Sequence, residues 1–337
     1  MGQSRRQFLK AGAAAAAGFA TAPLATATPT ALKRGAIARA ITSLFNRLPG
    51  DKALKILAPS TDNEGGLQVQ LNPGRRLFVA SADKTYVLCE ALRQADSPNI
   101  RNELERTELT LDSTVWSFGS PIFNPPDLSG TVSVRTTLEA MITRSDNTAT
   151  DMILKHVGAD NVRRFIAAAG LNDTQIPDST RALTGYVFGA PNYLNLTWEE
   201  LQQVVQGPQI FPFLNPVETF ASSADDFVSY YSRALQGEFF QNKATLNEFR
   251  RILTLCDFIY LVPLPLGVSA YAKSGNADTT GFHMRSMAGG MFFDNTWVYF
   301  AFVINWYAPA ANDPETVGQF FNAIQQSLRL VKFALSR

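Results

Sequence analysis

A serine and a lysine stand three residues apart, at Ser81 and Lys84, where a short apolar run gives way to a helical pattern. If a helix begins there, both side chains share one face at its N-terminus. A serine hydroxyl is a poor nucleophile at neutral pH, and a lysine amine can accept its proton when burial and neighbouring charge lower the lysine pKa. The unpaired backbone N–H groups of the helix end would stabilise a developing oxyanion. Taken alone, such a short pattern more often marks a capped helix with a solvated lysine.

Two further motifs lie downstream of this pair. Ser145-Asp146-Asn147 follows a helical pattern, and Lys273-Ser274-Gly275 lies on a strand-like segment near the C-terminus. In this order the three motifs form the signature set of class A β-lactamases and penicillin-binding proteins. The sequence therefore resembles this serine hydrolase family over nearly the whole chain after residue 27. Residues 131–138 and 141–154 look like the family's helix, turn and following helix.

The resemblance implies a chemical role for each motif. Ser81 would be the nucleophile, and Lys84 would be its general base in acylation. Ser145 would relay a proton to the leaving nitrogen, and Lys273 would supply the positive charge that keeps this relay and a substrate carboxylate in place. The structural alternative is that Ser81 caps a helix and that Ser-Asp-Asn is a helix-capping turn.

The same resemblance implies contacts with the substrate. Asn147 would contact the substrate's side-chain amide, while Asp146 would hold the turn. Ser274 lies at the family's usual contact for the substrate carboxylate. The backbone N–H of Asn276 would form the oxyanion hole together with the N–H of Ser81.

Three nearby residues leave alternatives open. Arg285, at the start of the next strand, either pairs with the substrate carboxylate or is an ordinary solvated arginine. Trp116 or Phe118 either walls the cleft as an aromatic gate or belongs to the core.

The sequence departs from the class A pattern between Ser145 and Lys273. Hydrolytic members of the family carry there an Ω-loop whose Glu, in a Glu-x-x-Leu-Asn context, activates the deacylating water, and no such match occurs over residues 172–195. The nearest candidate is Glu199, but Thr197 and Glu200 also match a capping box for a helix over residues 196–205, which we favour. The segment is enlarged, and the proline-rich stretch 208–216 either lines the site or covers the helical lobe. Because a general base contributes about 10²–10⁴ in rate, its loss would leave acylation intact and make deacylation slow.

Residues 1–27 are expected to be a twin-arginine signal peptide and are excluded from the fold. Arg5 and Arg6 precede an alanine-rich run that ends in a small-residue cleavage site at Ala25-Thr26-Ala27. This run is too weakly apolar for a membrane span, which needs about 20 strongly apolar residues. No Cys lies in this segment for a lipid anchor, so we expect the twin-arginine export machinery as a partner, no stable membrane anchor, and a periplasmic or secreted protein.

Composition narrows the other possibilities. The net charge is +1, which gives no reason to expect nucleic acid as a partner. His156 is expected to be structural, and His283 has no paired acid in the sequence, so neither suggests a catalytic triad. No cluster of His, Cys and carboxylates has metal-ligand spacing, and no cofactor is expected. Cys89 and Cys256 are expected to be buried free thiols.

The periodicity indicates an α+β fold, in which an antiparallel sheet is flanked by helices and joined to a mostly helical lobe. A first helix is expected over residues 35–48. Strands are expected at 55–58, 66–71, 76–80, 267–274, 284–293 and 297–305. The last of these is apolar on both faces, which is typical of a sheet covered on both sides, and an amphipathic helix closes the chain. We therefore expect a single domain over residues 28–337, with an α/β lobe from 28–80 and 257–337 and a helical lobe over 81–256.

Three functions fit these features. The leading hypothesis is an exported serine acyl-hydrolase of the class A β-lactamase type that opens a β-lactam amide or related ester through a Ser81 acyl-enzyme, with slow deacylation if the water-activating base is missing. The second is a penicillin-binding protein acting as a D-alanyl-D-alanine carboxypeptidase. The third is a non-catalytic sensor module that is merely acylated. In each case a monomer is expected.

Overall fold

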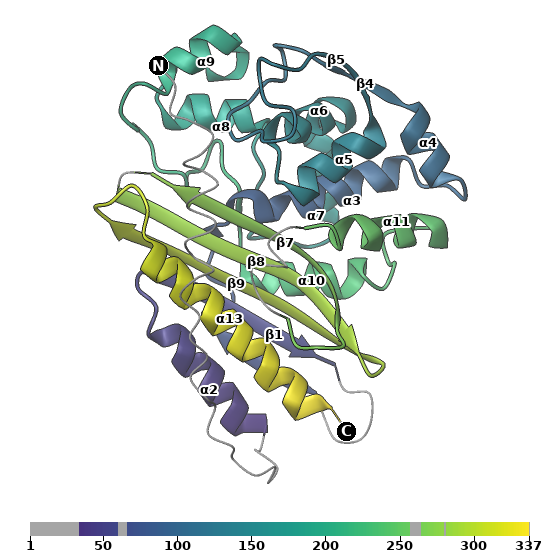
Figure 1. Cartoon of the computed structure of the whole chain (residues 1–337), viewed down its shortest axis with the longest axis vertical. Coiled ribbons are helices and arrows are strands. Elements are labelled where there is room, and N and C mark those ends of the chain that lie inside the picture. Colours follow the sequence, from purple (N-terminus) through teal and green to yellow (C-terminus); the bar gives the residue numbers. More distant parts are fainter. Residues whose placement is uncertain (1–33, 60–65, 257–263, 280, 337) are drawn as a thin grey trace.

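A computed structural model describes residues 34–59, 66–256, 264–279 and 281–336 of the chain. Within these residues one five-stranded antiparallel sheet, in the order β2-β1-β9-β8-β7, forms the centre of the molecule (Figure 1). Its strands are β1 (Asp51–Ala58), β2 (Leu67–Leu71), β7 (Ser269–Asp278), β8 (Gly281–Phe293) and β9 (Thr296–Ala308). Because β1 pairs with β9, the N-terminal and C-terminal parts of the chain build a single sheet.

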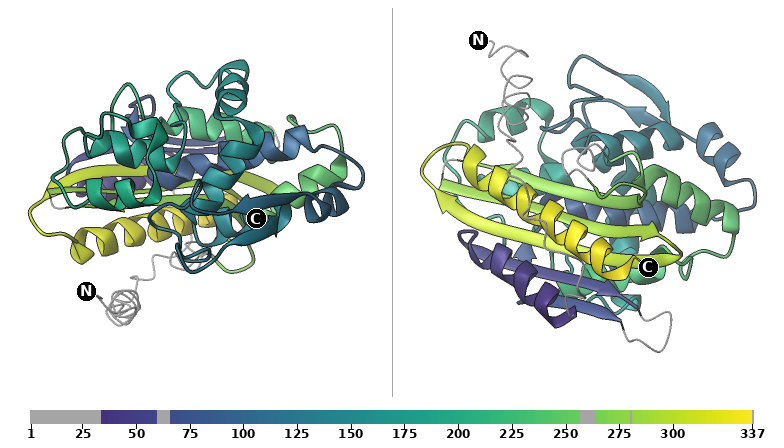
Figure 2. Two further views of the ribbon diagram at one scale, coloured as in Figure 1. Left: turned by 90° about the horizontal axis from the view of Figure 1, so that it is seen from above. Right: turned by 60° about the horizontal axis from the view of Figure 1, so that its bottom comes forward.

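Helices cover both faces of this sheet. One face packs against α2 (Arg34–Asn46) and α13 (Pro314–Leu335), which lie along the strands in Figure 2. In β9, Phe300 and Phe302 belong to the core under these two helices, whereas Tyr299 and Ala301 belong to the core shared with the helical lobe. A strand that is apolar on both faces needs this double cover, as expected from the sequence.

The middle of the chain forms the helical lobe on the other face. Its helices are α3 (Lys84–Gln94), α4 (Ile100–Arg106), α5 (Val134–Thr143), α6 (Asn147–Val157), α7 (Ala159–Ala168), α8 (Thr180–Val187), α9 (Trp198–Val204), α10 (Ala224–Ala234) and α11 (Lys243–Leu253). Two small antiparallel pairs join β3 (Leu77–Phe78) to β6 (Ala221–Ser222), and β4 (Glu108–Leu111) to β5 (Gly130–Ser133). None of the helices in the described part of the chain is long and apolar enough to cross a membrane.

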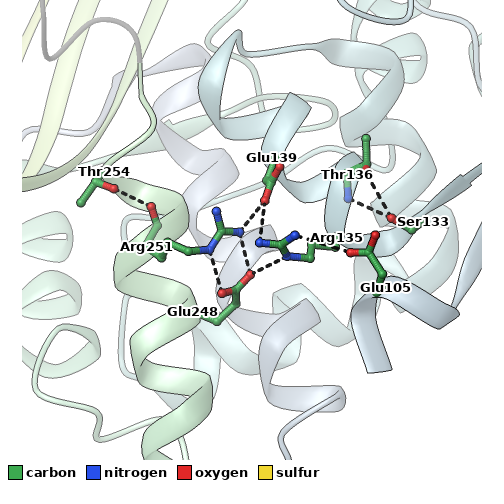
Figure 3. A network of polar contacts seen from close by, with 8 residues as sticks. All are labelled: Glu105, Ser133, Arg135, Thr136, Glu139, Glu248, Arg251 and Thr254. Carbon is green, nitrogen blue, oxygen red and sulfur yellow. Dashed lines mark hydrogen bonds and ion pairs between the residues drawn. The ribbon is translucent and has the colours of Figure 1, made fainter. Parts of the chain in front are cut away.

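A network of five charged side chains joins three helices of this lobe (Figure 3). Arg251 of α11 contacts Glu248 at 2.7 Å and Glu139 of α5 at 2.5 Å, and Arg135 of α5 contacts Glu248 at 3.3 Å and Glu105 of α4 at 3.5 Å. Partly buried networks stabilise more than isolated surface pairs. The network fixes α5, which leads directly to Ser145, against α11.

A long excursion, residues 176–220, leaves the helical lobe and returns to its starting point. Two backbone hydrogen bonds join the residues that flank this segment: Gln175 N donates to Ala221 O at 2.8 Å, and Ala221 N donates to Gln175 O at 3.0 Å. Since Ala221 also pairs with Phe78 in β3, the excursion ends beside the segment that leads to Ser81. We call residues 176–220 the Ω region; it contains α8, α9 and the 3₁₀ turn η2 (Tyr193–Asn195). The Ω region contains most of the segment in which the sequence departs from the class A pattern; its enlargement relative to other members of the family stays a prediction.

The expected boundaries differ from the structure at one functionally important place. The strand expected over residues 76–80 covers only Leu77–Phe78, and α3 begins at Lys84 instead of Ser81. Between them lies the 3₁₀ turn η1 (Ala80–Asp83), whose first residue, Ala80, is in the left-handed region at φ 46°. A left-handed alanine cannot continue a strand or start an α-helix, so the chain turns sharply at this point.

Candidate active site

Ser81 lies in η1, a turn that is fixed from two sides. Val79 N donates to Phe220 O at 2.8 Å, and Ser286 Oγ of β8 donates to Val79 O at 2.8 Å. These contacts hold the strained backbone of Ala80, and such strain persists only where the surroundings determine it. Ser81 is half-buried at the surface of this turn, whereas Ala82 is fully buried beneath it.

Lys84, in the first turn of α3, is completely buried and points toward the Ser145 turn. Its Nζ donates to Ser145 O at 2.6 Å, to Asn147 Oδ1 at 2.6 Å and to Asp146 O at 3.4 Å. Burial holds the pKa of Lys84 well below its usual range, and the nearby positive charge of Lys273 lowers the pKa further. A neutral amine is the form that can accept a proton from a serine hydroxyl.

Ser145 lies in the turn between α5 and α6 with its backbone in the left-handed region at φ 57°. The buried Asp146 holds this turn, as expected. Its Oδ1 accepts from Ala149 N at 2.8 Å and so caps α6, and its Oδ2 accepts from Ile122 N and Phe123 N at 2.9 Å each. A buried carboxylate with three backbone donors leaves the turn little freedom to move.

Lys273 approaches Ser145 from the opposite side, on β7. Its Nζ donates to Ser145 Oγ at 3.1 Å and to Ser274 O at 2.8 Å, and its side chain is buried. The structure therefore brings Lys84 and Lys273 to the same serine turn from two different elements. Three motifs that are far apart in the sequence meet at one place.

Gly275 explains why the third motif ends in glycine. A Cβ at this position would lie 2.1 Å from Val79 O, 2.7 Å from Ser286 Oγ and 3.0 Å from Ala82 N. Only a residue without a side chain allows β7 to approach the turn that carries Ser81 so closely. Asn276 follows directly on β7, which within the described residues is an edge strand. Its oxyanion role stays a prediction.

Ser274 and Cys256 form an unexpected contact beside the site. Ser274 is only 2% exposed, and its Oγ lies 3.9 Å from Sγ of Cys256, a contact that the sequence did not predict. The predicted contact of Ser274 with a substrate carboxylate stays a prediction. Cys256 and Cys89 are both buried free thiols, which confirms the expectation for the two cysteines.

Arg285 is not where either sequence alternative placed it. The solvated alternative is wrong, because the guanidinium is buried and donates to both carboxylate oxygens of Asp278, at 3.0 and 2.7 Å. The carboxylate alternative is not supported either, since the guanidinium lies over the ring of Trp306 at 5.9 Å, in the core under α2 and α13. Strand residues alternate between faces, so Arg285 points to the sheet face opposite Lys273.

His283 also has the acid partner that the sequence did not reveal. Its Nδ1 lies 2.9 Å from Oδ1 of Asp278, and because a carboxylate only accepts, Nδ1 donates this hydrogen bond. The pairing could not be found from sequence alone because the β7–β8 hairpin brings Asp278 and His283 into register. The pair lies with Arg285 and not with the catalytic candidates.

The capping interpretation of the α9 sequence is confirmed. Glu200 N donates to Thr197 Oγ1 at 3.1 Å, and Thr197 N donates to Glu200 Oε2 at 2.7 Å. Glu199 is exposed in the first turn of the same helix. Its role as deacylation base stays a prediction.

Phe118 and Asn147 link the Ω region to the site. Asn147 Nδ2 donates to Phe118 O at 2.7 Å, so both polar ends of the Asn147 side chain have partners within the protein. The Phe118 ring is 37% exposed and packs against Trp198 of α9 at 5.0 Å. Trp116 packs edge-on against the same Trp198 ring at 6.1 Å and is half-buried. The Ω region thus supports the aromatic residues next to Asn147.

Two buried carboxyl groups near the site were missed from the sequence. Asp151 accepts from Thr180 N at 2.6 Å and from Thr180 Oγ1 at 2.8 Å, and burial raises the pKa of Asp151 to about 6. Asp83 is fully buried, and neither of its carboxyl oxygens has a hydrogen-bond partner among the described residues. An acidic residue in an otherwise apolar stretch was the only available signal. Across the described ranges, no group of three or more His, Cys, Asp or Glu side chains could hold a metal.

The four motif side chains together suit one type of reaction. A serine three residues before a buried lysine of lowered pKa, in a turn that packs against the strand of a second lysine, supports acyl transfer through a covalent serine intermediate. Together with the sheet and the helical lobe, the site has the arrangement of the serine hydrolase family that includes β-lactamases and penicillin-binding proteins.

Comparison with known proteins gives the family. The model of the β-lactamase enzyme family matches residues 36–320, so the chain belongs to this family. A class A β-lactamase from Bacteroides cellulosilyticus superposes with a TM-score of 0.63 at 19% identity, covering 87% of this chain and 96% of that one. A β-lactamase from Chitinophaga pinensis gives 0.64 at 16% identity, covering 87% and 97%. A point mutant of PBP-A, in an acyl-enzyme complex with penicillin G, gives 0.63 at 17% identity, covering 90% and 99%. No curated protein matches the sequence.

Proposed function

We propose that this protein is an exported serine acyl-hydrolase of the class A β-lactamase type, which opens β-lactam amides or related esters through a Ser81 acyl-enzyme. The observation that carries the proposal is the environment of Lys84. Its amine is buried, its pKa is lowered, and its contacts with Ser145 O and Asn147 Oδ1 hold it at the serine turn. Burying a lysine completely is costly, which supports a chemical use for this amine in addition to its contacts with the turn.

The proposed acylation uses four side chains and two backbone donors. Ser81 Oγ attacks the carbonyl carbon of the substrate, and its proton passes to Nζ of Lys84. The backbone N–H groups of Ser81 and Asn276 stabilise the oxyanion. The C–N bond then breaks, and the leaving nitrogen takes a proton from Ser145 Oγ, which is replenished from Lys84, while Lys273 keeps Ser145 Oγ in place at 3.1 Å.

Deacylation is proposed to be slow. Glu199 is the nearest candidate in the Ω region for the base of this step, but it is exposed in the first turn of α9, and Glu200 is engaged in the capping box. Without a base to activate water, the second step loses about 10²–10⁴ in rate while the first is unaffected.

Rapid mixing with a chromogenic cephalosporin tests this function. We expect a burst of product with an amplitude equal to the enzyme concentration, followed by slow turnover. Ser81→Ala should show neither phase. Absence of both a burst and turnover with a panel of penicillins, cephalosporins and activated esters would contradict the proposal.

A second candidate is D-alanyl-D-alanine carboxypeptidase activity. It is favoured by the match in fold to PBP-A and by the exposed position of Glu199. Release of D-alanine from a D-alanyl-D-alanine peptide, faster than hydrolysis of any β-lactam, would establish it. If Ser81 is acylated and the acyl group is never released, the site would instead serve as an acylated sensor.

Export is a separate part of the proposal. The twin-arginine signal over residues 1–27 lies outside the described residues, and we propose that it directs a monomeric protein to the periplasm or the exterior. Replacing Arg5 and Arg6 by Lys should leave folded precursor in the cytoplasm. Export that survives this change would contradict the twin-arginine route.

A further inference from the structure

The end of the β7–β8 hairpin at its turn holds a partly buried group of polar side chains on the sheet face away from Ser81. Arg285 forms a two-point ion pair with Asp278, at 3.0 and 2.7 Å, and His283 donates to the same carboxylate at 2.9 Å. The Arg285 side chain is 11% exposed and the Asp278 side chain 25%. Bidentate, partly desolvated pairs of this kind are geometrically specific and stronger than exposed ones.

Arg285 also binds the backbone of both strands. Its guanidinium donates to Met284 O of β8 at 2.7 Å and reaches Ala277 O of β7 at 3.4 Å. Ala277 and Asp278 directly follow Asn276, and Asn276 is itself the register partner of Arg285. One side chain therefore joins the edge strand, just beyond Asn276, to its neighbour.

The group is anchored to the rest of the fold. The ring of His283 stacks on Trp306 of β9 at 5.2 Å, and Trp306 Nε1 donates to Asp313 Oδ2 at 3.0 Å. Asp313 caps α13 by accepting from Thr316 N at 3.1 Å. The end of β7 is thus connected through packed side chains to the N-terminus of the longest described helix.

An edge strand beside a reacting group needs such an anchor. Within the described residues, β7 pairs only with β8, so its other side has no ladder of hydrogen bonds to hold it. Upstream, the close approach of Gly275 to Val79 and Ala82 fixes the strand. The side chain of Asn276 is exposed, so it does not fix the strand by packing as Gly275 does. An oxyanion donor must be held within about 0.5 Å of its productive position, so both ends of this short segment need support.

We propose that Arg285, Asp278 and His283 form a clamp, acting from the opposite face of the sheet, that positions the backbone N–H of Asn276 for oxyanion stabilisation. These three are positioning residues, since none of them reaches the reacting atoms. The inference rests on the proposed acylation of Ser81 and on the assignment of Asn276 as an oxyanion donor.

Arg285→Lys tests the clamp, with Arg233→Lys as a matched control. Arg233 makes the same kinds of contact far from the strand end, with Glu238 at 2.8 Å, Ala169 O at 2.7 Å and the Phe239 ring at 4.8 Å. Losing an oxyanion donor costs about 10²–10³ in rate, so a displaced donor should slow acylation about tenfold or more. The C=O stretch of the acyl-enzyme, measured by infrared difference spectroscopy, should move to higher wavenumber because its hydrogen bond weakens. Arg233→Lys should change neither quantity.

These experiments distinguish a failure of the clamp from a failure of the proposed acylation of Ser81. A folded Arg285→Lys protein with the wild-type acylation rate and carbonyl band would overturn the clamp; if this variant does not fold, Asp278→Asn is judged by the same criterion. Asn276→Pro removes the N–H whereas Asn276→Ala keeps it. Equal acylation rates of these two variants would overturn the clamp and the oxyanion role of Asn276, while the proposed acylation of Ser81 would stand. A wild-type protein that no β-lactam or activated ester acylates would overturn both.

Discussion

Nζ of Lys84 lies 2.6 Å from Oδ1 of Asn147, so the amide side chain that was expected to contact the substrate also holds the proposed general base. Asn147 is in turn oriented by its bond to Phe118 O at 2.7 Å. The proposed base is therefore held in place by contacts within the protein. Such preorganisation is what makes a buried lysine useful for acid–base catalysis.

The charge of Lys273 should contribute to the pH dependence of acylation. Burial and the charge of Lys273 both lower the pKa of Lys84, and acylation needs the neutral amine. The acylation rate should therefore fall as the pH is lowered through the pKa of Lys84. Lys273→Met removes one cause of the lowered pKa, so this decline should begin at a higher pH. A pH profile that keeps its position in the variant would contradict Lys84 as the base.

A methyl group at Gly275 should disturb the nucleophile turn. In Gly275→Ala the new Cβ would meet Val79 O and Ser286 Oγ, and overpacking of this kind costs about 1–3 kcal/mol in the free energy of unfolding. Acylation should fall as well, because η1 or β7 must move. The control is Gly318→Ala in α13, where nothing lies within 4 Å and a gain of about 0.5–1 kcal/mol is expected. Denaturant unfolding of both variants checks the contrast.

The buried Asp83 should make the protein less stable as the pH rises. Burial, and next the charge of Asp226, hold the pKa of Asp83 well above its ordinary 3.8, so the folded state keeps a proton that the unfolded state releases. Stability is then lost progressively above pH 3.8 up to the folded-state pKa. Asp83→Leu should remove this dependence, and its advantage in melting temperature should be larger at pH 8 than at pH 5. An equal advantage at both values would show that Asp83 does not retain a proton on folding.

The two carboxylates of α9 should be dispensable for deacylation. Glu200→Gln keeps an acceptor for Thr197 N and should cost little stability, whereas Glu199→Gln should leave release of the acyl group unchanged. Single-turnover traces with a chromogenic cephalosporin measure this step directly. A tenfold or greater slowing, confined to the second phase of one variant, would identify that carboxylate as a relocated base.

The convergence of Ser81, Ser145 and Lys273 could be predicted from the sequence because the three motifs occur in the order of the family that the sequence resembles. The β8–β9 hairpin of the sheet could also be predicted, because two long apolar segments are joined by Asp294 and Asn295. In the structure both turn residues are left-handed, at φ 45° and 58°, as a tight hairpin turn requires. The turn at Ala80 was not predictable, because its left-handed backbone is imposed by contacts with Phe220 and Ser286 that arise only in the folded chain.

Arg285 occupies a sheet face that could not be predicted from the local sequence. Its type and its place on the strand after Lys273-Ser274-Gly275 suit a carboxylate contact, but the face it occupies depends on the register between β7 and β8. A shift of one residue exchanges the two faces of a strand. The cluster with Asp278, His283 and Trp306 follows from that register and from the position of β9, neither of which the sequence specifies locally.

The central claim is a covalent Ser81 acyl-enzyme, and intact-mass spectrometry tests it most directly. After brief incubation with benzylpenicillin and acid quench, the wild-type protein should gain the full mass of one penicillin, because ring opening loses no atoms. Peptide mapping should place the added mass on Ser81, and Ser81→Ala should stay unmodified. An unmodified wild-type protein that also releases no hydrolysed penicillin, or an equal adduct on Ser81→Ala, would contradict the account.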